Sequence, residues 1–277
     1  MESLVTTEWL AGQLGAPDLV VADASYFLPV HGRDAKEDYL AGHIPDAVFL
    51  DLATLRDESD PRPNMIPPAD IFAARMQALG IGHADRIVLY DDSPLRNAAR
   101  AWFMLRAFGA KKAAILDGGI AKWRAEGRPV ETGPEQTREK QFTPRPQPAG
   151  IVNLAFMRAN LDSHAVQVAD ARSAERFDGG GPLDAHGVPG GHIPGSANLP
   201  YARLFDADGT WKRGDALRAE FEAAGIDPVR PFVATCGSGV TAAAILFAAH
   251  LLGHEGRLYD GSWSEWGADP GTPKATR

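Results

Sequence analysis

Short apolar runs alternate with longer segments of helical periodicity along this chain. Residues 86–91 (RIVLYD) and 231–236 (PFVATC) are short and mostly apolar, which is typical of buried strands. Residues 96–109 (RNAARAWFMLRAFG) carry apolar side chains at helical spacing and end at a glycine, so they predict a helix. Strands that alternate with helices form parallel sheets covered on both faces. The pattern therefore predicts an α/β fold with a mainly parallel sheet flanked by helices.

The same series of motifs occurs twice in the sequence. Three pairs recur in the same order and at nearly equal spacing: Asp-Ala at 23 and 170, His-Ile-Pro at 43 and 192, and Asp-Gly at 117 and 260. Repetition at a nearly constant interval indicates a tandem duplication. We therefore expect two domains of the same architecture.

A segment rich in proline, glutamate and glutamine separates the two copies. It lacks apolar periodicity, which is typical of an extended linker. We predict a first domain at residues 1–132, a linker at 133–150 and a second domain at 151–277.

The composition excludes several classes of function. The strongly apolar run at residues 242–252 is interrupted by His250 and is too short to span a bilayer, so we expect no membrane partner. No basic block with interleaved aromatic residues is present, which argues against nucleic-acid binding. A single cysteine permits no internal disulfide and fits a reducing compartment, and the first residues lack a signal-peptide pattern. We expect a cytoplasmic protein whose net charge of −8 requires local donors for any anionic substrate.

The single cysteine, Cys236, lies where a predicted strand runs into a predicted helix. Ligands of parallel α/β sheets bind at this edge, where strands end. The residues that follow the cysteine and lead into the helix are Gly237, Ser238, Gly239, Val240 and Thr241. Glycines let backbone N–H groups converge on one point, and a helix N-terminus favours an anion and the thiolate form of cysteine. We predict that this segment, the cysteine loop, holds a nucleophilic thiolate.

Other interpretations of Cys236 are weaker but are not all excluded. A phosphatase-like loop needs an arginine six residues after the cysteine, where this chain has Ala242, and a dithiol motif needs a second cysteine. A buried structural cysteine and a protease-like cysteine–histidine pair remain alternatives. No set of histidine, cysteine or carboxylate residues has the spacing of metal ligands. The nearest pair, His250 and His254, lies across a predicted helix end with a glycine between the two residues. We expect no metal and no other cofactor.

Together these motifs resemble the tandem rhodanese-domain sulfurtransferases, and among them most closely the 3-mercaptopyruvate sulfurtransferases. The resemblance covers nearly the whole chain and rests on four segments: CGSGVTA at 236–242, DGSWSEW at 260–266, GHIPG at 191–195, and DAR with ERF within 170–177. It implies two rhodanese-like domains, of which the first lacks a nucleophile because Asp91 stands near the place of Cys236. It also implies that Cys236 takes sulfur from 3-mercaptopyruvate as a persulfide, releases pyruvate, and passes the sulfur to cyanide or to a thiol acceptor such as thioredoxin or a small thiol.

The resemblance also implies how the sulfur donor is held. Arg176 matches an arginine that grips the donor carboxylate, for which a planar guanidinium is suited. A second arginine of the family would fall at Ala185, where the adjacent His186 is a candidate substitute. The neutral Gly237 and Ser238 favour mercaptopyruvate, whereas Ala185 favours the alternative of a thiosulfate sulfurtransferase.

A relay of Ser238, His43 and Asp34 is the remaining implication of the resemblance. It would deliver a proton during sulfur transfer, which requires a group of near-neutral pKa within hydrogen-bond reach. His192 occupies the equivalent position in the second copy, so His43 has the alternative role of bracing a loop. For Arg172 we expect a structural role. A third reading of the whole chain is a non-catalytic persulfide-carrier or binding module.

Overall fold

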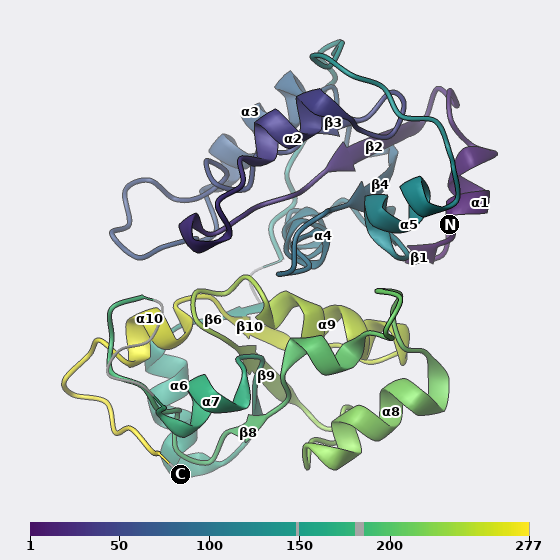
Figure 1. The fold of residues 1–277 in the computed structure, drawn as a ribbon. Helices are drawn as coiled ribbons and strands as arrows, with labels where there is room; N and C mark the ends of the chain where they lie inside the picture. The colour runs from purple at the N-terminus through teal and green to yellow at the C-terminus, as the bar shows by residue number, and fades with distance from the viewer. Residues whose placement is uncertain (148–149, 181–185, 277) are drawn as a thin grey trace. The chain divides into compact units, whose positions relative to one another are not determined.

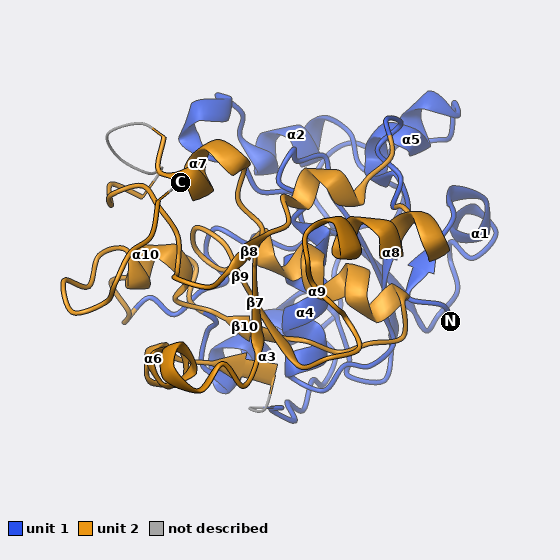
Figure 2. Cartoon of the chain, turned by 90° about the horizontal axis from the view of Figure 1, so that it is seen from below, with its two compact units in different colours: residues 1–58, 66–147, 207–211 blue, residues 59–65, 148–206, 212–277 orange. Residues whose placement is uncertain are grey.

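The computed structural model describes residues 1–147, 150–180 and 186–276. The chain forms two compact units (Figure 2). The first comprises Met1–Glu58, Ile66–Gln147 and Ala207–Trp211, and the second comprises Ser59–Met65, Pro148–Asp206 and Lys212–Arg277. The predicted boundaries separate the two sequence copies, whereas the compact units exchange two short segments between those copies.

The first unit contains a five-stranded parallel sheet (Figure 1). Its order is β1 (Leu4–Val5), β5 (Ala113–Leu116), β4 (Arg86–Tyr90), β2 (Leu19–Asp23) and β3 (Val48–Phe49). Its helices are α1 (Thr7–Ala11), η1 (Pro29–His31), α2 (Ala35–Ala41), α3 (Ala69–Ala78), α4 (Ala98–Ala107) and α5 (Gly119–Ala125). Leu10, Tyr39 and Trp123, from α1, α2 and α5, share one buried cluster with the strands. Since side chains alternate across a strand, the other strand residues face the opposite side, where α4 packs on β4 and β5.

The second unit repeats this topology strand for strand. Its order is β6 (Ile151–Val152), β10 (Arg257–Tyr259), β9 (Phe232–Thr235), β7 (Gln167–Asp170) and β8 (Ala197–Asn198), all parallel. Its helices are α6 (Leu154–Ser163), α7 (Ala174–Asp178), η3 (Tyr201–Leu204), α8 (Gly214–Ala223), α9 (Ala242–Leu251) and α10 (Ser262–Trp266). Side chains of α6 and α10 share a buried cluster with the strands, and α9 packs on β9 and β10. The predicted α/β fold and its duplication are confirmed.

Helix α9 is buried on nearly all sides. Residues 242–249 are all buried, so its apolar sequence reflects a central position in the unit and not an amphipathic surface helix. Because α9 begins directly after the cysteine loop, the core of the second unit fixes the position of that loop.

The predicted linker has no helix or strand up to residue 147, but it packs along the first unit. Phe142 is buried, and its ring centroid lies 5.7 Å from that of Phe72 in α3. Lys140 Nζ lies 2.7 Å from Asp85 Oδ2, and Arg145 N donates to the carbonyl of Phe108. Composition predicts the absence of regular structure here but gives no sign of this packing.

Replacing Phe142 by alanine tests whether this segment belongs to the first unit. Removing a buried phenylalanine leaves a cavity, so Phe142→Ala should lower the free energy of unfolding by about 3 kcal/mol. Urea denaturation followed by circular dichroism measures the change. The neighbouring exposed Gln141 provides the control, since Gln141→Ala should leave the transition unchanged. Equal urea midpoints for both variants would mean that the segment connects the units without stabilising the first one.

Candidate active site

Two backbone hydrogen bonds from the first turn of α10 hold the cysteine loop in place. Trp263 N donates to the carbonyl of Cys236 at 3.0 Å, and Ser264 N donates to the carbonyl of Gly237 at 2.8 Å. In a trans peptide the N–H points opposite to the C=O. The N–H groups of Gly237 and Ser238 are therefore directed to the side of the loop away from α10.

Four N–H groups of the loop have no acceptor among the residues that the structure describes: those of Gly237, Ser238, Val240 and Thr241. All but Thr241 belong to buried residues, and Gly239 has a φ of 78°, which allows the loop to turn before α9. Buried N–H groups that lack an acceptor carry a free-energy cost, which a bound anion offsets. Cys236 is itself only 2% exposed. The loop thus has the geometry of an anion-binding site around a buried thiol.

Two nitrogen-bearing side chains lie over Gly237. A methyl group built on this glycine would lie 2.8 Å from Arg176 Nη2 and 2.6 Å from His186 Nε2. Arg176 belongs to α7, and His186 follows the predicted position of the missing arginine, Ala185, which lies outside the described residues. The structure therefore brings Arg176 and His186 together beside the residue that follows Cys236.

Ser238 is 6% exposed, and its Oγ accepts a hydrogen bond of 2.9 Å from Asn64 Nδ2. Asn64 belongs to the segment at residues 59–65 that packs with the second unit. Sequence reasoning missed this residue, because nothing in its local sequence marks a partner 174 positions away.

Asp34 and His43, which belong to the first unit, lie at opposite ends of α2. Asp34 Oδ1 caps the helix by accepting from Lys36 N at 2.8 Å and Glu37 N at 2.9 Å. His43 is 3% exposed, its Nδ1 lies 2.8 Å from the carbonyl of Tyr39, and its ring stacks on the ring of Tyr39. No hydrogen bond joins the two side chains in the part of the chain that is described. Their participation in a relay with Ser238 stays a prediction.

His192 of the second unit has the same packing as His43. Its Nδ1 lies 2.8 Å from the carbonyl of Phe177, and the two rings stack with centroids 3.8 Å apart. The backbone of each histidine also forms an isolated antiparallel β-bridge, with Glu131 in the first unit and with Ala275 in the second. Bracing alone therefore accounts for a buried histidine at this position in either copy.

Arg172 has a structural environment. Its side chain is fully buried, pairs with Asp170 at 2.7 Å, and donates to the carbonyl of Gly191 at 2.7 Å. The guanidinium carbon lies 4.6 Å from the centroid of a Trp263 ring. These contacts hold the ends of β7 and α10 together.

The corresponding loop of the first unit carries a carboxylate in place of the thiol. Asp91 follows β4, and its two oxygens accept from Ala98 N at 2.7 Å and Ser93 N at 3.2 Å. Burial raises the pKa of Asp91 to about 6. The carboxylate thus satisfies amides of its own loop, and this copy has no nucleophilic thiol.

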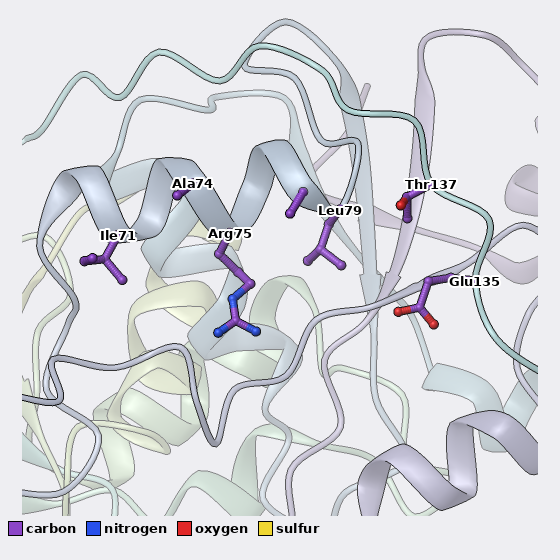
Figure 3. Close-up of a pocket in the computed structure, with 7 residues that line it drawn as sticks. Ile71, Ala74, Arg75, Leu79, Glu135 and Thr137 are labelled. Atoms are coloured by element: carbon purple, nitrogen blue, oxygen red, sulfur yellow. The ribbon is translucent and has the colours of Figure 1, made fainter.

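A pocket of about 530 Å³ lies elsewhere on the first unit, between α3 and the segment at 135–137 (Figure 3). Figure 3 shows the guanidinium of Arg75 extending from α3, with Glu135 and Thr137 on the neighbouring segment. None of the predicted site residues lines it. Among the described residues there is no cluster of three metal-ligating side chains and no helix long and apolar enough to cross a membrane.

Comparison with known proteins identifies the family. The rhodanese-like domain family matches residues 6–126 and 154–269, so the chain belongs to this family and contains two copies of its domain. The chain is 38% identical over 271 residues to human 3-mercaptopyruvate sulfurtransferase, covering 95% of this chain and 91% of the human one. It is also 38% identical over 282 residues to the thiosulfate sulfurtransferase of Bos taurus, with the same coverage.

The fold matches a solved structure of the same kind. The crystal structure of SseA from Escherichia coli, described as a 3-mercaptopyruvate sulfotransferase with the rhodanese fold, superposes with a TM-score of 0.87 at 36% identity. The match covers 96% of this chain and all of SseA. The prediction of a tandem rhodanese-domain protein similar to the 3-mercaptopyruvate sulfurtransferases is confirmed.

Replacing Gly237 by alanine tests the role of the two side chains above the loop. The added methyl group must displace Arg176 and His186, which should weaken the binding of anions beside Cys236. Iodoacetate is an anionic and iodoacetamide a neutral alkylating agent, so the ratio of their rates with Cys236 reports local anion binding. We expect Gly237→Ala to lower the rate with iodoacetate, relative to the rate with iodoacetamide, roughly ten-fold, which corresponds to one lost charge-assisted hydrogen bond.

Gly12 offers a matched control, since a methyl group there meets only ordinary contacts at 3.6 Å. Gly12→Ala should leave both rates unchanged. An unchanged ratio in Gly237→Ala, at an unchanged melting temperature, would remove Arg176 and His186 from the anion site.

Proposed function

We propose that this protein moves sulfane sulfur from 3-mercaptopyruvate to a thiol or cyanide acceptor through a persulfide on Cys236. One observation carries the proposal: a buried thiol lies in a loop whose N–H groups at Gly237, Ser238, Val240 and Thr241 lack acceptors among the described residues. Such groups stabilise the thiolate before the reaction and the persulfide anion after it. The relatives' activities support the same chemistry.

The reaction has two balanced half-reactions. The thiolate of Cys236 attacks the sulfur of the donor, so an S–S bond forms and the donor's C–S bond breaks. The electron pair of that bond passes to the three-carbon fragment as the enolate, which takes up a proton and leaves as pyruvate. In the second half-reaction an acceptor thiolate attacks the outer sulfur, so a new S–S bond forms and the S–S bond to Cys236 breaks. The acceptor leaves as a persulfide, and the electron pair of the broken bond regenerates the thiolate of Cys236.

Arg176 is the proposed clamp for the donor carboxylate. Its guanidinium lies beside the cysteine loop, and a planar guanidinium pairs with a carboxylate through two parallel hydrogen bonds. His186 also lies beside Gly237 and adds a second nitrogen donor, whereas this chain has Ala185 where the resemblance implies a second arginine. Because Gly237 and Ser238 are neutral, the loop suits the singly charged carboxylate of mercaptopyruvate.

Protonation of the departing enolate is the proposed role of Ser238, with His43 and Asp34 as its relay. The hydroxyl of Ser238 is buried in the loop itself, which supports its part. For His43 and Asp34 the proposal rests on the resemblance alone, since each has a structural partner.

Thiosulfate is the second candidate donor. The equal identity to a thiosulfate sulfurtransferase favours it, as does Ala185 in place of a second arginine. The acceptor is proposed to be thioredoxin or a small thiol, and the single cysteine fits a cytoplasmic location.

Intact-protein mass spectrometry tests the proposed function. After brief exposure to 3-mercaptopyruvate the protein should gain one sulfur atom and release one equivalent of pyruvate, and a thiol should then remove the sulfur. Cys236→Ser should abolish both the gain and the turnover while leaving the fold intact, since the chain has no second cysteine. Loading by thiosulfate alone would establish the second candidate. A protein that no donor loads would be a carrier or binding module.

Replacing Arg176 tests the carboxylate clamp. Arg176→Ala should raise KM for 3-mercaptopyruvate roughly ten- to hundred-fold with a smaller change in kcat, because the clamp stabilises bound donor and transition state alike. Arg176→Lys keeps the charge without the bidentate geometry and should fall between the two. Steady-state kinetics of pyruvate release measures both constants. A KM unchanged in the alanine variant would place the donor carboxylate elsewhere.

A further inference from the structure

Residues 59–65 contact the cysteine loop, although their sequence belongs to the first copy. They are part of the second compact unit, separated in sequence from the rest of it by Ile66–Gln147. Asn64, near the end of this segment, donates from Nδ2 to Ser238 Oγ at 2.9 Å. Neither the family match, which treats each domain separately, nor the duplication explains this connection.

An ion-pair network anchors the segment to α10. Arg62 hydrogen-bonds to Asp60 within the segment and to Glu265 in α10. The hydrogen bond with Arg62 lowers the pKa of Asp60 to about 2, so this carboxylate stays charged at neutral pH. Glu265 directly follows Ser264, whose N–H holds the carbonyl of Gly237. The same helix therefore fixes both the cysteine loop and the segment that carries Asn64.

The backbone at Asn64 aims its side chain at the loop. Its φ is 59°, in the left-handed region, which asparagine adopts more readily than other residues with a side chain. Asn64 is half-buried, and Ser238 is buried. Asparagine therefore suits this backbone position and, from it, reaches the buried hydroxyl of Ser238.

The direction of this hydrogen bond decides what Ser238 can do. An amide NH₂ group only donates, so the hydroxyl oxygen of Ser238 acts as the acceptor. A serine hydroxyl has one hydrogen to donate, and Asn64 does not consume it. We propose that Asn64 is a positioning residue, which holds Ser238 so that its O–H is directed into the cysteine loop, where it donates first to the thiolate of Cys236 and then to the departing enolate. This inference rests on the proposed function for its role in turnover.

A double-mutant cycle between residues 64 and 238 tests the proposal. Asn64→Asp keeps the shape but turns the donor into an acceptor, so the hydroxyl hydrogen of Ser238 is drawn to the carboxylate. We expect kcat for sulfur loading to fall about ten-fold with KM unchanged, and Asn64→Ala to fall similarly. In a Ser238→Ala background neither change should cost more than about two-fold, because the positioning group then has nothing to position.

A control and a second readout separate this inference from the proposed function. Asn153→Asp, at the N-cap of α6, makes the same chemical change while preserving its capping role and should leave kcat unaltered. The same cycle is also measured on the rate at which iodoacetamide alkylates Cys236, which needs no sulfur donor. If no donor loads the wild type, the proposed function fails, and the alkylation cycle still decides the role of Asn64.

Additive effects in both readouts would overturn the positioning role, and so would full activity of Asn64→Asp. Arg62→Ala provides a second variant in case the substitutions at Asn64 prevent folding. It releases the anchor without touching Ser238, and it should lower kcat in the wild type but not in Ser238→Ala. A drop of equal size in both backgrounds would show a general structural effect of the segment.

Discussion

The chemistry of the second unit depends on two hydrogen bonds from α10 to the cysteine loop. By taking the carbonyls of Cys236 and Gly237, Trp263 N and Ser264 N force the next amides to face the other way. Ser262 supports this arrangement, since its Oγ accepts from Cys236 N and donates to the carbonyl of Tyr259. Without these contacts the loop could satisfy its own amides and would no longer favour an anion.

The first unit shows what the same frame does without the thiol. Ile120 N donates to the carbonyl of Asp91 at 3.4 Å, as Trp263 N does to Cys236. Gly119 stands where the second copy has Ser262, and a side chain there would meet the carbonyl of Asp91 at 2.5 Å. The frame is thus retained, but the Asp91 carboxylate accepts from amides of its own loop, whereas four amides of the cysteine loop lack an acceptor among the described residues. The two copies share the scaffold, whereas their loops differ in sequence, with Asp91 in one at the place of Cys236 in the other.

The sequence was sufficient for the features that local chemistry determines. The parallel sheets of the two domains follow from a duplicated β/α pattern, and the cysteine loop from glycines placed between a buried strand and an apolar helix. The order of the strands within each sheet was not predicted. The repeated His-Ile-Pro motif also raised the bracing role that His43 and His192 share. The positions of Asn64 and Arg62 could not be predicted in this way, because each depends on a partner more than a hundred residues distant. Packing of Phe142 was hidden for a similar reason, since a lone aromatic residue has no periodicity.

The exchanged segment makes the second unit depend on the first copy, which has no thiol of its own. Residues 59–65 are encoded in that copy, yet they are part of the second compact unit and contact Ser238 within it. A chain that kept only the second copy would lose the ion pair between Arg62 and Glu265, and with it the partner of the loop hydroxyl. A substitution at residues 59–65 of the first copy therefore also changes the surroundings of the cysteine loop in the second. The two copies are duplicates in fold, but residues encoded in both contribute to the second compact unit.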